Sequence, residues 1–243
     1  LFTFLPEAVL GALIIHAVWH LITSRKLHHV RLASPTEFWL GMAALLGVLL
    51  IDVLPGMIIG MVAALLLVIA RSSRPHIASL GRSPQSHTLY SDLARHPENR
   101  VIPGVIIARP DAQLYYANAQ YFRDSVKAFI MERRAANTDA TRLHTVIIDA
   151  ETQDSLDLTS SAILEGLVKE LHATGLNVYA AAVHSPVAEL SRRTGLAAYF
   201  SVDHVFASVH SAVEYAEAHT QFAPGMGAAE ESAHMALAHQ TIL

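Results

Sequence analysis

The sequence predicts an α-helical membrane segment followed by a soluble α/β domain in which helices flank a mixed β-sheet. The chain of 243 residues is 52% hydrophobic and only 16% charged, and its mean hydropathy is +0.35. This apolar excess lies at the front, because residues 1–70 contain few charged side chains. These are Arg25, Lys26, Arg31, Glu7, Glu37 and Asp52. From about residue 84 onward, apolar runs of strand length alternate with helical patterns, which is typical of α/β domains.

Three apolar stretches cover residues 8–23, 38–51 and 53–70. The first has enough apolar length to cross a bilayer. A Pro55-Gly56 break separates the second from the third. As one straight helix, residues 38–70 would be roughly 50 Å long, against a hydrocarbon core of about 30 Å. We therefore expect two short helices here and three spans in all.

Basic residues follow the first and third stretches, which with three crossings places both clusters on one side of the membrane. These are Arg25, Lys26 and Arg31, then Arg71, Arg74 and Arg82. The positive-inside rule assigns that side to the cytoplasm, and the clusters suit anionic headgroups. The competing interpretation is a buried helical hairpin in a soluble protein. It is disfavoured because residues 38–51 have no polar face.

The second half predicts a series of strands and helices. Asn118 is expected to cap the first helix, and residues 222–243, rich in Ala, Gly and His, are expected to be disordered. Strands are expected at 104–110, 114–116, 144–149, 177–183 and 203–206. Helices are expected after Asn118, and at 160–173, 185–195 and 208–218.

Several functional classes are excluded. A net charge of −4 and a pI near 6.4 argue against nucleic-acid binding. The chain has no cysteine, which removes disulfides and thiolate sites. The acids at 149, 151, 154 and 157 have no clustered histidines beside them. No metalloprotease, nucleophile-elbow or phosphate-loop motif occurs. We expect no enzyme, and we assign no catalytic residue, metal ligand or cofactor.

Two long segments resemble the STAS domain of SulP-type anion transporters, the sulfate permease family. Residues 101–130 contain an Arg-Pro-Asp turn and a Tyr-Ala-Asn-Ala-x-x-Phe helix entry, and residues 144–171 contain Asp149 and an Asp157-x-Thr159 loop. Upstream, residues 34–82 are similar to the last two spans of that family and their exit into the cytoplasm.

The resemblance implies the C-terminal part of a multi-pass secondary active anion transporter in the plasma membrane. Residues 1–71 would be its last three spans, 72–100 a linker, 101–221 the STAS domain and 222–243 the tail. The expected partners are the bilayer, the missing upstream spans, a second copy of the chain, and an anion of the sulfate or bicarbonate class. In this family the anion lies between half-helices earlier in the sequence, so no substrate ligand is assigned here. A first residue of Leu1 fits a fragment.

The best local site is the loop that holds Asp157, Thr159 and Ser160. Related STAS domains of the anti-sigma-factor-antagonist type carry Asp-x-Ser-Gly here, with a phosphorylated Ser. Asp157 and Thr159 match that motif, and Ser160 replaces the Gly. A phosphate or other anion at a helix start would be stabilised by free N–H groups. The alternative is that Thr159 or Ser160 only caps the helix.

Polar residues inside the apolar stretches form a second set of candidates. His16 and His20 share one helical face, suited to a metal or a proton path, or simply to interhelical hydrogen bonds. Asp52 is expected at the outer turn in water, with a role in ion passage as the alternative. A different overall hypothesis is a self-contained, membrane-tethered STAS module that acts by partner switching through phosphorylation of Thr159.

Overall fold

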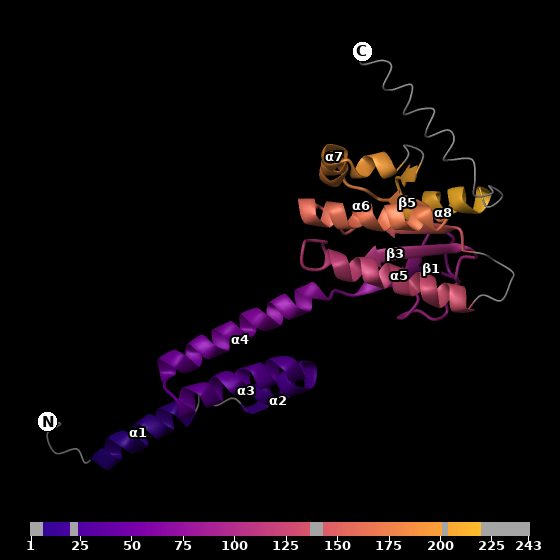
Figure 1. The fold of residues 1–243 in the computed structure, drawn as a ribbon. Helices are drawn as coiled ribbons and strands as arrows, with labels where there is room; N and C mark the ends of the chain where they lie inside the picture. Colours follow the sequence, from indigo (N-terminus) through magenta and orange to yellow (C-terminus); the bar gives the residue numbers. More distant parts are fainter. Residues whose placement is uncertain (1–6, 20–23, 137–142, 201–203, 220–243) are drawn as a thin grey trace. The chain divides into compact units, whose positions relative to one another are not determined.

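The computed structural model describes residues 7–19, 24–136, 143–200 and 204–219, in two compact units (Figure 1). The first unit is Leu1–Arg71 and the second is Ser72–Leu243. The predicted tail at 222–243 lies outside the described residues.

The first unit is helical. It contains α1 (Glu7–Trp19), α2 (Ser24–Ala33), α3 (Pro35–Leu50) and α4 (Val53–Ser73), which continues to the start of the second unit. The predicted apolar stretches correspond to α1, α3 and α4. Among the described residues, α4 is the one helix long and apolar enough to cross a membrane: it has 21 residues, and its most apolar 18-residue window has a mean hydropathy of 2.7. The apolar helices α1 and α3 are shorter, with 13 and 16 residues. Most of their large apolar side chains are exposed, as expected for helices that face lipid.

Small residues bring α3 and α4 close together near their connection. A Cβ atom added to Gly56 would lie 2.3 Å from the backbone nitrogen of Val48, and one added to Gly60 would lie 2.8 Å from Cβ of Ala44. Glycines four residues apart permit such a backbone approach between membrane helices. Near the other ends of the two helices, the Arg71 guanidinium lies 3.2 Å from the Glu37 carboxylate. The two helices therefore form an antiparallel hairpin.

The second unit contains a six-stranded mixed sheet in the order β2-β1-β3-β4-β5-β6. The strands β3 to β6 are parallel, and β1 is antiparallel to both of its neighbours. The strands are β1 (Ile77–Arg82), β2 (Tyr90–Asp92), β3 (Val105–Pro110), β4 (Thr145–Asp149), β5 (Asn177–Ala181) and β6 (Val205–Phe206). The predicted fold class, membrane helices followed by a mixed α/β domain, is confirmed. Residues 72–100, predicted as a linker, instead supply β1 and β2.

Helices cover both faces of this sheet. They are α5 (Ala119–Ala136), α6 (Leu158–Ala173), α7 (Ser185–Thr194), the 3-10 turn η1 (Leu196–Tyr199) and α8 (Val209–Ala218). On one face, α5 and α6 bury Phe122 and Leu167 against Val146 of β4. On the other face, α8 buries Val213 against Ile147. Neighbouring residues of β4 thus enter different cores, as the alternation of side chains along a strand requires.

Three local expectations differ from the structure. The predicted strand at 114–116 is absent: residues 114 and 115 are irregular, and residues 116–118 form a turn. Within it the Asn118 side chain accepts a hydrogen bond from the Tyr115 N–H at 2.9 Å, so it holds the turn and does not cap α5. The strand expected at 177–183 ends at Ala181, because Ala182 adopts a φ of 53°. The helix expected at 160–173 begins two residues earlier, at Leu158.

Candidate functional site

Asp157 organises the loop that connects β4 to α6. One carboxylate oxygen accepts a hydrogen bond from the Ser160 N–H at 2.7 Å, which makes Asp157 the N-cap of α6. Its other carboxylate oxygen accepts the Tyr116 N–H, also at 2.7 Å. One side chain therefore fixes the start of α6 and ties it to the turn that precedes α5.

Thr159 and Ser160 differ sharply in accessibility. Thr159 is exposed on the first turn of α6. Ser160 is fully buried, and its hydroxyl has no hydrogen-bond partner in the structure. The alternative in which Thr159 or Ser160 caps the helix is therefore wrong. Asp157 takes that role because it precedes the first helical residue and offers a charged acceptor.

A buried glutamine supports the same loop. The Gln153 side chain, 4% exposed, accepts the Leu114 N–H at 2.7 Å and donates to the Ala112 carbonyl at 3.1 Å. Beside it, the Gln113 side chain donates to the Ser155 hydroxyl. These contacts hold the turn after β3 against the loop after β4. No sequence pattern indicates a role for Gln153, since a single glutamine beside acidic residues is typical of an exposed loop.

Asp149 ends β4 and is 1% exposed. Burial raises the pKa of its carboxyl, and the nearby charge of Glu151 adds to this. The hydrogen bond from the Glu151 N–H and the charge of Arg109 act in the opposite direction. In the part of the chain that the structure describes, no group of three or more His, Asp or Glu side chains converges on a possible metal.

The intramembrane candidates belong to the first unit. His16 lies on α1, and His20 lies outside the described residues. Asp52 precedes α4; its side chain accepts the Val53 N–H at 2.7 Å, and its carbonyl accepts the Gly56 N–H at 3.0 Å. Asp52 therefore begins α4, with its negative charge at the positive end of the helix dipole.

Comparison with known proteins identifies the second unit. Residues 96–212 match the model of the STAS domain. The chain is 27% identical over 217 residues to Probable sulfate transporter 4.2 of Arabidopsis thaliana, a match that covers 88% of this chain and 32% of the relative. It is 27% identical over 209 residues to a probable sulfate transporter of Mycobacterium tuberculosis, covering 86% of this chain and 36% of that protein.

Solved structures give the same result for the fold. The murine SLC26A9 anion transporter in the inward-facing state matches with a TM-score of 0.68 and 25% identity, over 88% of this chain and 34% of that one. A second SLC26A9 structure matches with a TM-score of 0.69 and 22% identity, over 90% of this chain and 37% of that one.

The fold and the matched residues define a STAS-domain protein of the transporter-linked class. A match of 217 residues is longer than the second unit, so it extends into the helices of the first. Residues 96–212 form a STAS domain, and the chain as a whole is similar to sulfate transporters that carry one. The chain spans about a third of the length of the curated relatives that it matches.

Proposed function

We propose that this chain is the C-terminal part of a SulP-type secondary active transporter that carries sulfate, with a cytoplasmic STAS domain that regulates or dimerises it. One observation carries the proposal: a continuous similarity to sulfate transporters covers 88% of the chain, through the apolar helices and the STAS domain in one order. A free-standing STAS domain would match over the second unit alone.

The distribution of charge supports the orientation. Arg71 lies in the last turn of the long apolar helix α4, Arg74 and Arg82 follow it, and no Lys or Arg lies between α3 and α4. With α1, α3 and α4 as three crossings, the positive-inside rule places the second unit in the cytoplasm. The shorter α1 and α3 would be accommodated by neighbouring helices or by local thinning of the bilayer.

The substrate site is expected in upstream spans. The described part of the first unit offers His16 and Asp52, and neither is an anion site of the kind that half-helix N-termini build. The chain alone should therefore move no anion, and its contribution should appear only when it is joined to the remaining spans.

The test is sulfate uptake into liposomes by a chimera. The C-terminal third of the Mycobacterium tuberculosis relative is replaced by this chain, beside the intact relative, the relative truncated at the junction, and this chain alone. We expect labelled sulfate to enter with the chimera and not with the truncated relative or the isolated chain. Uptake by the isolated chain above protein-free liposomes would overturn the proposal. A correctly inserted chimera that moves no sulfate would also count against it.

A second candidate is a membrane-tethered STAS module that acts by partner switching. The exposure of Thr159 on the first turn of α6 favours it, because an exposed hydroxyl is open to a kinase and a phosphate there would lie at the positive end of the helix dipole. Its test is a kinase-dependent mass increase of about 80 Da, as expected for one phosphate. The increase should be lost in Thr159→Ala and kept in Ser160→Ala. Absence of any modification under cellular conditions would reject this candidate.

A further inference from the structure

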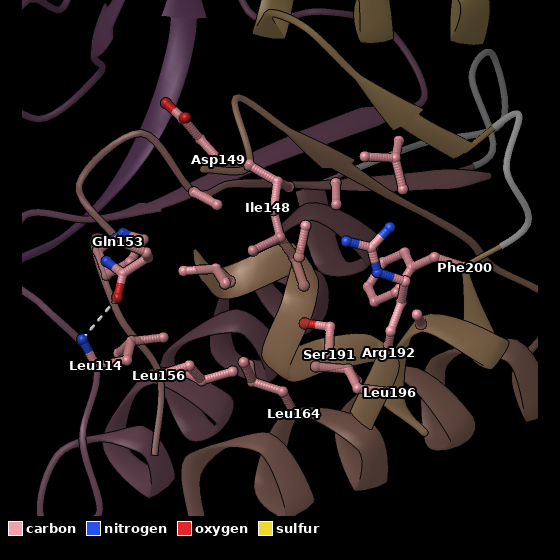
Figure 2. Close-up of a pocket in the computed structure, with 18 residues that line it drawn as sticks. Leu114, Ile148, Asp149, Gln153, Leu156, Leu164, Ser191, Arg192, Leu196 and Phe200 are labelled. Carbon is pink, nitrogen blue, oxygen red and sulfur yellow. Dashed lines mark hydrogen bonds between the residues drawn. The ribbon is translucent and has the colours of Figure 1, made fainter. Parts of the chain in front are cut away.

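A mainly apolar pocket of about 330 Å³ lies in the second unit, between the ends of β4 and β5 and the layer formed by α7 and η1 (Figure 2). Its walls come from the loop after β4, the first half of α6, and the inner sides of α7 and η1. Most of the lining side chains are aliphatic or aromatic. They include Leu114, Ile148, Leu156, Leu164, Leu196 and Phe200.

The polar groups near the pocket fall into two sets. Gln153 is already engaged with the backbone of residues 112 and 114, and in Figure 2 the Asp149 carboxylate points away from the pocket. Ser191 and Arg192 of α7 form the other set. Figure 2 shows the Arg192 guanidinium turned toward the pocket. No described acidic residue lies within ion-pair distance of it.

Size and polarity together define what such a pocket can hold. At about 30 Å³ for each water-sized group, the volume is that of about ten such groups. Because the walls offer few polar partners, they hold water poorly, and an apolar group that displaces this water gains affinity. Concave, largely apolar cavities with one or two convergent polar groups are the usual form of a small-molecule site.

We propose that this pocket binds a medium-chain aliphatic carboxylate. The tail lies among Ile148, Leu164 and Leu196, and the carboxylate pairs with the Arg192 guanidinium, whose planar fork matches a carboxylate. The Ser191 hydroxyl is placed to donate a further hydrogen bond. A cation beside the pocket selects a negative head group, and the apolar interior selects an aliphatic tail.

The test measures binding to the full chain in phosphatidylcholine nanodiscs by ¹³C NMR of carboxyl-labelled decanoate. Decanol and butyrate serve as competitors. We expect a saturable bound signal for decanoate that butyrate displaces poorly, because butyrate lacks the tail. Amide hydrogen exchange in α7 and η1 should slow when decanoate binds, since both elements form the pocket wall. Decanoate that enters only the lipid, with no saturable signal and no change in exchange, would overturn the proposal.

Matched variants distinguish the contribution of the head group to binding from that of the tail. Arg192→Gln should weaken decanoate binding at least about tenfold and leave decanol unchanged, because it removes a charge-assisted contact. Arg193→Gln, at the neighbouring exposed position that does not line the pocket, should change neither. Ala188→Phe should fill the entrance and block both ligands, and Ala188→Ser should block neither. Equal effects of Arg192→Gln and Arg193→Gln on decanoate binding would contradict the pairing of the carboxylate with Arg192. This comparison holds even if Ala188→Phe does not fold.

Discussion

The carboxylate of Asp157 accepts two backbone hydrogen bonds, so this residue should contribute most to the stability of the candidate loop. Its Oδ1 caps α6, and its Oδ2 holds the turn before α5. Asp157→Ala should lower the free energy of unfolding of the second unit by about 2 kcal/mol, because a cap and a second hydrogen bond are lost. Amide hydrogen exchange in β4 measures this. The control is Asp154→Ala, an exposed neighbour whose loss should cost less than about 0.5 kcal/mol. Equal effects would contradict the role given to Asp157.

The ionised carboxylate of Asp92 should make the second unit more stable at neutral pH than at acidic pH. Burial raises the pKa of this carboxyl, but the Ala94 N–H and the His76 ring, 2.8 Å away, together with the charges of His76 and Arg95, outweigh burial and lower it. Because the pKa of Asp92 is lower in the folded than in the unfolded chain, its ionised carboxylate stabilises the fold above the unfolded pKa of about 3.9. This stabilisation is lost as the pH falls through the folded pKa. Asp92→Asn should therefore destabilise the second unit at pH 7. The difference from the wild type should fade below about pH 4. A constant difference in hydrogen exchange across pH 3 to 7 would reject this.

Asp149 should have the opposite effect on stability: its ionisation should destabilise the second unit at neutral pH. Its pKa is raised by burial, so its ionisation costs stability above the folded pKa, and this cost disappears as the pH falls toward about 4. Asp149→Asn keeps an oxygen for the Glu151 N–H and removes the buried charge. The variant should be more stable than the wild type at pH 7, and its advantage should shrink at acidic pH. Lower stability at pH 7 would show that the ionised form makes a favourable contact.

Sequence patterns located the loop but did not show which of its residues caps the helix, which is buried and which bridges to the neighbouring turn. The Asp157-x-Thr159 spacing pointed to the correct turn, because acidic and hydroxyl residues mark helix starts. Which of them caps depends on where the backbone turns, and that is set by the tertiary contact with Tyr116. The burial of Ser160 and the bridging by Gln153 also follow from packing between loops distant in sequence. No local pattern contains that information.

At the scale of elements, the α3–α4 hairpin depends on glycine. The chain has no cysteine, so an Ala44→Cys/Gly60→Cys pair reports the approach of the helices by forming a disulfide. The Cβ positions, 2.8 Å apart, need to open by about 1 Å to reach disulfide geometry. Adding Gly56→Leu should abolish this cross-link, because its side chain would enter the Val48 backbone. Adding Gly41→Leu should not, since nothing lies within 4 Å of a Cβ there. Efficient cross-linking with Gly56→Leu would refute the close approach.

Long, strongly patterned elements were predictable, and short ones were not. The apolar helices, β3, β4 and the helices that cover the sheet have clear periodicity. β1 is buried on both faces and includes Gly81, and β2 has only three residues, so neither shows the alternation of a strand. The polar helix α2 carries little apolar pattern. The false strand at 114–116 arose because two tyrosines favour strands, whereas the Asn118 side chain fixes a turn there.

The whole molecule divides into a helical unit with exposed apolar side chains and a STAS unit with its own core. This division rests on an apolar α4 whose side chains are almost all outside any core and on a STAS unit with cores on both faces of its sheet. The transporter proposal and the orientation of the STAS domain both require this division.

Labelling of single cysteines in membrane vesicles tests whether α4 lies in lipid and the STAS unit in the cytoplasm. Gln85→Cys lies on an exposed loop of the STAS unit, and Ala63→Cys lies at the middle of α4. With a membrane-impermeant maleimide, Gln85→Cys should react in inside-out vesicles and not in right-side-out vesicles, and Ala63→Cys should react in neither. Labelling of Gln85→Cys only in right-side-out vesicles, or of Ala63→Cys as readily as Gln85→Cys, would contradict the account.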